Sequence, residues 1–137
     1  MKFEGDTKIS PSSKGYAKYK GSEDDFQKKV ALYLDFNRAI WFHPANERKT
    51  KVYLNEKGQR FSPEGLRLKA KGVKSGVPDC IVLNAKRGFS GLAIELKVGS
   101  NTLSVTQIEF MHKLNSLGWL CWVSWSLDEV VELVDWY

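Results

Sequence analysis

The sequence predicts an α/β domain in which a mixed central β-sheet is flanked by helices. Three apolar runs have the length and composition of buried strands, and they occupy residues 80–83, 92–97 and 119–125. Further segments have apolar residues at helical spacing and begin at serine N-caps. Strands and helices alternate along the chain, which favours a sheet covered by helices.

The N-terminal part of the chain predicts a tail, a helix and a strand. Residues 1–21 are polar, basic and aperiodic, so we expect a flexible basic tail before a single domain over 22–137. Ser22 is a suitable N-cap for a helix that extends to about Phe36. Its first turn is acidic, and its apolar stripe consists of Phe26, Val30, Tyr33 and Leu34. Residues 40–43 then predict a strand, which Pro44 ends.

The central segment is basic. Residues 44–61 have no periodicity and predict irregular structure. Ser62, Pro63 and Glu64 together indicate a helix start, and the short basic helix is expected to reach Lys71 before Gly72 ends it.

The C-terminal half predicts the centre of the sheet. Residues 80–83 and 92–97 are two strands joined by the turn-forming segment 84–91, so they are expected to form a hairpin. Ser104 can cap a helix that ends at Gly118, with a buried stripe of Ile108, Met111, Leu114 and Phe110. The Trp-rich run 119–125 is expected to be a core strand rather than a base-stacking surface. Ser126 and Glu129 predict a capping box for a last helix to about Trp136.

The two cysteines, Cys80 and Cys121, lie in separate apolar runs without the spacing of a zinc site. They are expected to be buried thiols in a reducing cytoplasm. The chain has no apolar segment like that of a secretory signal and no run long enough to span a membrane. We therefore expect a soluble cytoplasmic protein without a membrane partner.

Charged residues interrupt the most apolar hairpin. Glu95 and Lys97 lie two apart in the strand 92–97, so their side chains share one face while Leu96 points into the core. Burying either charge is costly unless another group compensates it. Asp79 opens the partner strand; if the turn centres on Gly88, Asp79 falls opposite Lys97 and next to Glu95.

A cross-strand ion pair would explain any one of these residues, but it leaves the second carboxylate unexplained. Phosphodiester hydrolysis explains all three. Two carboxylates and a backbone carbonyl form an oxygen site suited to Mg²⁺, and Mn²⁺ is expected to substitute for it. A neighbouring lysine can orient the attacking water, accept its proton or offset transition-state charge. These roles remain open at this point.

The pattern Pro78-Asp79, fifteen intervening residues, then Glu95-Leu96-Lys97 resembles the signature of the PD-(D/E)XK nuclease superfamily. The flanking segments are similar to its VRR-NUC branch, particularly the stand-alone, phage-type members. These segments are residues 72–79, the helix start Ser104…Gln107, Glu23-Asp24-Asp25-Phe26-Gln27 and His43-Pro44-Ala45-Asn46-Glu47. The resemblance covers roughly residues 22–125 and implies a restriction-endonuclease-like core.

The resemblance also implies roles for individual residues. Asp79, Glu95 and the Leu96 carbonyl would bind metal, and Lys97 would be the catalytic lysine. A further acid usually joins such a centre, and Glu23 and Glu47 compete for that role. The helix dipole alone explains an acid at Glu23, and Glu47 is supported mainly by the similarity of its surroundings. Gln107 fits a capping box, and the resemblance adds a contact to the lysine or to a metal-bound water. His43 could contact a phosphate, although a packed, hydrogen-bonded histidine is the commoner arrangement.

The charge distribution indicates a polyanionic partner. The chain has 21 basic and 16 acidic residues, a net charge of +5 and a pI near 9.2. Between Arg48 and Lys74 there are nine Lys or Arg and two acids. The residues expected to contact the DNA backbone are Arg48, Lys49, Lys51, Arg60, Arg67, Lys69, Lys71 and Lys74.

The sequence contains no recognition helix and no zinc module, so structure-selective cutting of branched DNA such as flaps or Holliday-type junctions is expected. A homodimer would grip a branch, with the C-terminal strand and helix as its expected interface. Two alternatives remain: a non-catalytic nucleic-acid-binding module with the same fold, and an RNA-directed nuclease. A phage-encoded chain would act in the host cell cytoplasm.

Overall fold

The structure is a computed structural model, and it describes residues 15–44 and 50–137. Its centre is a four-stranded sheet with the strand order β1-β4-β5-β6. The pairs β1–β4 and β4–β5 are antiparallel, and the pair β5–β6 is parallel, so the sheet is mixed as predicted. The strands are β1 (Trp41–Phe42), β4 (Cys80–Val82), β5 (Leu92–Leu96) and β6 (Leu120–Ser124).

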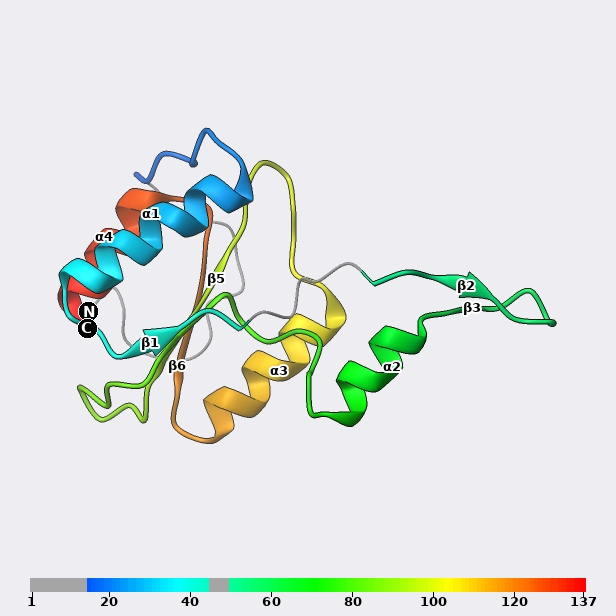
Figure 1. The fold of residues 1–137 in the computed structure, drawn as a ribbon. Helices are drawn as coiled ribbons and strands as arrows, with labels where there is room; N and C mark the ends of the chain where they lie inside the picture. Colours follow the sequence, from blue (N-terminus) through cyan, green and yellow to red (C-terminus); the bar gives the residue numbers. More distant parts are fainter. Residues whose placement is uncertain (1–14, 45–49) are drawn as a thin grey trace.

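Helices cover both faces of this sheet (Figure 1). Helices α1 (Glu23–Phe36) and α4 (Leu127–Trp136) pack together on one face, and α3 (Val105–Ser116) lies on the other. Side chains of β5 alternate between the two layers: Ile94 and Leu96 join the core under α1 and α4, and Ala93 joins the core under α3. Because both faces are covered, β5 is a continuous apolar run apart from Glu95.

Serine caps begin the helices where the sequence predicts them. The Ser22 hydroxyl accepts from the Asp25 N–H, and Ser104 forms a reciprocal capping box with Gln107. At α4 the Ser126 hydroxyl accepts from the Glu129 N–H, while the buried Glu129 carboxylate accepts from the Ser124 hydroxyl at 2.7 Å. Glu129 thus ties α4 to the end of β6.

The segment before β4 forms a projecting arm, which we define as residues 50–74. It contains a two-stranded ribbon of β2 (Tyr53–Leu54) and β3 (Arg60–Phe61), followed by α2 (Pro63–Ala70). The prediction of irregular structure was wrong for the ribbon, because two strands of two exposed residues each carry no alternation of burial. Figure 1 shows the arm extending away from the sheet, and α2 has no buried residue.

The described part of the expected N-terminal tail, residues 15–21, is attached to the domain. The Tyr19 N–H donates to the Trp125 carbonyl at 2.7 Å, and the Tyr19 ring stacks on Phe26. Tyr16 donates a hydrogen bond to Glu132. The tail expectation therefore does not hold for this stretch, since its tyrosines supply apolar surface that a basic segment otherwise lacks. Residues 1–14 lie outside the described residues.

Both cysteines are free and buried, as predicted. In the described ranges, none of the helices combines the length and the apolar character needed to cross a bilayer. β6 is an edge strand of the sheet, and its side chains are buried within this chain.

Candidate active site

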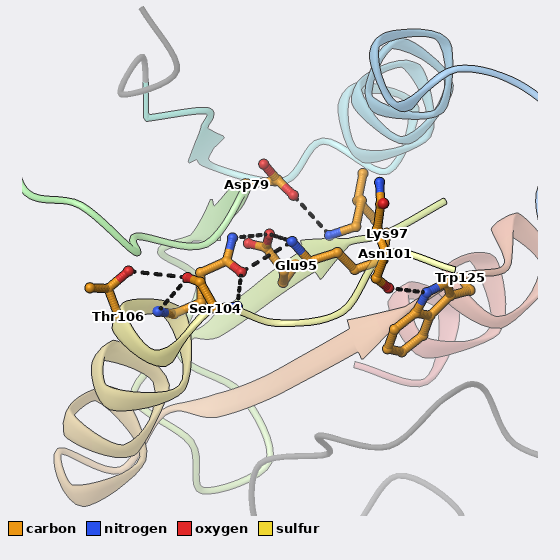
Figure 2. Close-up of polar contacts among 9 residues, drawn as sticks. Asp79, Glu95, Lys97, Asn101, Ser104, Thr106 and Trp125 are labelled. Carbon is orange, nitrogen blue, oxygen red and sulfur yellow. Dashed lines mark hydrogen bonds and ion pairs between the residues drawn. The ribbon is translucent and has the colours of Figure 1, made fainter. Parts of the chain in front are cut away.

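Asp79, Glu95 and Lys97 meet at one end of the β4–β5 hairpin (Figure 2). Asp79 immediately precedes β4, Glu95 lies within β5 and Lys97 directly follows it. Their exposed fractions are 7%, 1% and 8%, so all three ionisable side chains are withdrawn from water. Such burial requires compensating partners, which the surrounding elements supply in part.

The strand register differs from the one that the sequence suggested. Cys80 pairs with Ile94, so extending the ladder by one residue places Asp79 opposite Glu95 rather than opposite Lys97. The Asp79 Oδ2 atom accepts from the Leu96 N–H at 2.8 Å, which fixes the aspartate across the end of β5. The expected register was wrong because it depends on the geometry of the 83–91 connection.

Glu95, Lys97 and Gln107 form a closed polar triangle. The Lys97 Nζ atom lies 3.2 Å from Glu95 Oε1 and donates to Gln107 Oε1 at 3.1 Å. Gln107 Nε2 donates to the same Glu95 Oε1 at 2.7 Å. One amide side chain therefore hydrogen-bonds to a buried acid and a buried base together. The Lys97 N–H also donates to the Ser124 carbonyl at 2.9 Å, which holds the lysine backbone against β6.

The first turn of α3 positions Gln107. Its Oε1 atom accepts from the Ser104 N–H at 2.9 Å, so the capping residue and the site residue are the same side chain. Both expected roles of Gln107, in the cap and at the lysine, thus occur together. The loop before β4 packs tightly on this turn: Gly76 has φ +82°, and a Cβ there would lie 2.4 Å from the Thr106 carbonyl oxygen. Only glycine allows this approach.

Burial controls the ionisation of Glu95. Desolvation, together with the neighbouring Asp79 charge, raises the pKa of Glu95 to about 8, although Lys97 acts to lower it. A carboxylic acid next to a second carboxylate in low dielectric resists losing its proton. A positive charge between the two acids would reverse this effect.

The donor set fits a hard divalent cation. Glu95 Oε2 is buried, and within the described part of the chain it has no hydrogen-bond partner. An unsatisfied buried carboxylate oxygen is costly, and oxygen atoms of this kind are preferred ligands of Mg²⁺. Among residues 15–44 and 50–137, however, no group of three or more His, Cys, Asp or Glu side chains could hold a metal. A complete shell therefore requires a carbonyl, such as that of Leu96, or water.

Comparison with known proteins supports the predicted fold class. No protein-family model matches the chain, and no curated protein matches it. A solved structure described as a "VRR_NUC domain protein" superposes with a TM-score of 0.60, at 26% sequence identity, over 87% of this chain and 90% of that one. The chain has a VRR-NUC domain fold. The predicted family resemblance and the restriction-endonuclease-like fold class are confirmed, and a VRR-NUC domain is a nuclease-type domain.

Of the two acids expected to complete the metal centre, only Glu23 lies in the described part of the chain. Glu23 is half-buried in the first turn of α1, and its charge contributes to raising the pKa of Glu95. Glu23 thus lies within electrostatic reach of Glu95 without forming a three-acid group. Glu47 lies outside the described residues.

His43 has a positioning contact that the sequence did not specify. Its Nδ1 atom lies 2.6 Å from the Asp79 carbonyl oxygen, and since a carbonyl can only accept, the ring nitrogen donates. This hydrogen bond ties the residue that follows β1 to the residue that precedes β4. No local sequence pattern predicts that His43 lies close to Asp79, because 35 residues separate them. The sequence indicated a role for His43 only through the resemblance of the segment His43-Pro44 to the family.

Six of the eight basic residues expected to contact DNA lie on the arm. Arg48 and Lys49 lie outside the described residues. The other six are exposed on the arm or at its end, and they are Lys51, Arg60, Arg67, Lys69, Lys71 and Lys74. The arm leads directly into the loop that ends at Asp79, so these charges are continuous in sequence with the candidate active site.

Proposed function

We propose that this VRR-NUC domain is a metal-dependent nuclease that hydrolyses phosphodiester bonds in DNA, with branched DNA as its substrate. The observation that supports this most strongly is the buried Glu95 carboxylate, whose Oε2 atom lacks a partner among the described residues while Asp79 and Lys97 lie beside it. A purely structural ion pair would not need the second acid.

Asp79, Glu95 and the Leu96 carbonyl are the groups that would hold Mg²⁺, with Mn²⁺ as a substitute. When bound, the ion would polarise the scissile phosphate and lower the pKa of a water nucleophile. The hydrogen bond from the Leu96 N–H keeps the Asp79 carboxylate at the end of β5, so the two acids are oriented before any ligand arrives.

Lys97 is proposed to stabilise the charge that develops on the phosphate. Its Nζ atom is fixed between Glu95 Oε1 and Gln107 Oε1 and lies in a side chain that is 10% exposed. An ammonium held in low dielectric stabilises transition-state charge more strongly than one in water. Gln107 is a positioning residue, because it acts through Lys97 and Glu95.

The arm is proposed to hold DNA on the approach to this centre. Its exposed lysines and arginines can contact backbone phosphates, which position a substrate without reading its bases. Selection by shape, as for flaps or junctions, is consistent with contacts of this kind.

The experiment is cleavage of labelled flaps, junctions, duplexes and single strands with Mg²⁺, Mn²⁺ or chelator. We expect metal-dependent cutting of branched DNA, and a loss of about 100-fold or more for Glu95→Ala and for Lys97→Ala with binding retained. Lys28→Ala, an exposed lysine on α1, is the matched control. Unchanged cutting by Glu95→Ala refutes the assignment. Binding without cutting under any metal indicates a binding module, and exclusive cutting of matched RNA indicates an RNA-directed enzyme.

A further inference from the structure

A polar cavity lies at the opposite end of the sheet from the candidate active site. Its floor is apolar, and its rim is basic; the residues concerned are Leu34, Val82 and Leu92 in the floor and Arg38, Lys86 and Arg87 at the rim. The volume is about 480 Å³, within the range of small-molecule sites. Trp136, near the end of α4, also lines it.

This cavity is separate from the nuclease centre. Leu92 begins β5, while Glu95 lies three residues further along the same strand. Leu92 belongs to the core under α1 and α4, and the alternation of β5 puts Glu95 on the other face, beside Ala93. A phosphate in this cavity is therefore not the scissile phosphate.

Arg38 occupies a backbone position that disfavours arginine. It follows the Asn37 cap of α1 with φ +56°. The Arg38 N–H donates to the Asp35 carbonyl and the Ala39 N–H to the Leu34 carbonyl, which is the Schellman arrangement. Glycine or asparagine is the usual residue at this left-handed position, because the Cβ atom of other residues crowds the backbone carbonyl there, and the short asparagine side chain offsets this by hydrogen-bonding locally.

Arg87 repeats this anomaly at the tip of the β4–β5 connection. It has φ +52° and is followed by Gly88 at φ +81°, in a turn closed by the Phe89 N–H donating to the Lys86 carbonyl. Turns of this type favour asparagine or glycine at the first of these positions. The two left-handed residues of the described chain that are not glycine are thus both arginines, and both line the same cavity.

Contacts within the described chain account for the placement of the Arg87 side chain but not for those of Arg38 and Lys86. The Arg87 guanidinium lies 4.5 Å from the centre of the Trp136 ring, and its Nε donates to the Trp136 carbonyl. Among the described residues, the Arg38 guanidinium and the Lys86 ammonium have no hydrogen-bond or ion-pair partner. Asp135, the acid that also lines the cavity, accepts a hydrogen bond from Tyr33.

We propose that this cavity binds a phosphate group, carried either by a nucleotide or by a nucleic-acid strand away from the cutting site. Arginine suits this ligand because its planar guanidinium can donate two parallel hydrogen bonds to phosphate oxygens. A strained backbone at Arg38, whose guanidinium has no partner among the described residues, is typical of a ligand site, where function retains a residue that folding disfavours. The proposal does not depend on nuclease activity.

The substitution Arg38→Asn distinguishes a role of Arg38 in ligand binding from a role in stabilising the fold. Asparagine adopts the left-handed backbone more readily than arginine, so the variant should be at least as stable as the wild type without ligand. If Arg38 instead served the fold, the variant would be less stable. Lys86→Gln removes the second unpartnered charge without altering a left-handed residue.

The test is titration of the full chain, in chelator, with inorganic phosphate, a 5′-mononucleotide and a short duplex, following the Trp136 indole resonance by NMR. We expect a saturable shift of that resonance, weakened about tenfold or more in Arg38→Asn and in Lys86→Gln. Lys28→Gln removes the same charge from a distant surface and should bind like the wild type.

The three ligands distinguish the source of the phosphate. A stronger response to the mononucleotide assigns the cavity to a free nucleotide, and a response to the duplex alone assigns it to a nucleic-acid backbone. The proposal is overturned if none of the three shifts the Trp136 resonance, if Arg38→Asn binds like the wild type, or if Arg38→Asn is less stable than the wild type without ligand. Because chelator is present throughout, failure here leaves the nuclease proposal untouched.

Discussion

Replacing Glu95 with glutamine should stabilise the metal-free protein at alkaline pH while abolishing its activity. Glutamine retains an oxygen that can accept from Gln107 Nε2 and Lys97 Nζ, the two partners of Glu95 Oε1. The substitution changes the charge of the side chain and leaves its volume nearly the same. The effect on stability therefore reports the cost of a buried carboxylate.

The magnitude follows from the pKa of Glu95. It rises from 4.5 to about 8 on folding, so between these values the folded chain retains a proton that the unfolded chain has released. The folded state then binds more protons than the unfolded state, and the free energy of unfolding falls as the pH rises through this window. Each pKa unit corresponds to about 1.4 kcal/mol, so the loss is on the order of 3–5 kcal/mol.

The assay is urea unfolding in chelator at about pH 5 and about pH 9, with both variants followed by tryptophan fluorescence. The wild type should lose stability between the two conditions, and Glu95→Gln should lose much less. Glu109→Gln, an exposed glutamate on α3, is the control. Parallel losses in the wild type and Glu95→Gln would refute the reasoning, because the pH dependence would then arise elsewhere. Mg²⁺ should stabilise the wild type at high pH and leave Glu95→Gln unaffected.

Three further predictions concern the neighbours of Glu95. Asp79→Asn keeps an oxygen to accept from the Leu96 N–H, so its urea midpoint should stay near that of the wild type while its cleavage rate falls about 100-fold or more. Gln107→Ala removes a helix cap and the hydrogen bond to Lys97. The free energy of unfolding of this variant should fall by about 1–2 kcal/mol, and its cleavage rate should drop. Wild-type values for both would contradict the positioning role of Gln107. Glu23→Gln should lower the pKa of Glu95, seen as a shift of its pH-dependent unfolding to lower pH, and undiminished cleavage would exclude Glu23 as a metal ligand.

Much of the fold was predictable because its signals are local. Serine caps at Ser22 and Ser104 and continuous apolar runs at β5 and β6 are properties of neighbouring residues, and the structure has those elements there. The ribbon at 53–54 and 60–61 was missed because its exposed residues give no periodic burial. The attachment of Tyr19 to Trp125 was missed because the partners are distant in sequence.

The sequence by itself determined which residues needed an explanation: two acids and a lysine in segments too apolar to hold them without compensation. Tertiary structure decided how they meet. It set the register that puts Asp79 across from Glu95. It also brought Gln107, on α3, into contact with both Glu95 and Lys97, and it placed Arg38 and Arg87 around a separate cavity. Burial preference is a property of each side chain, whereas these distances depend on turn geometry and on packing between elements far apart in the chain.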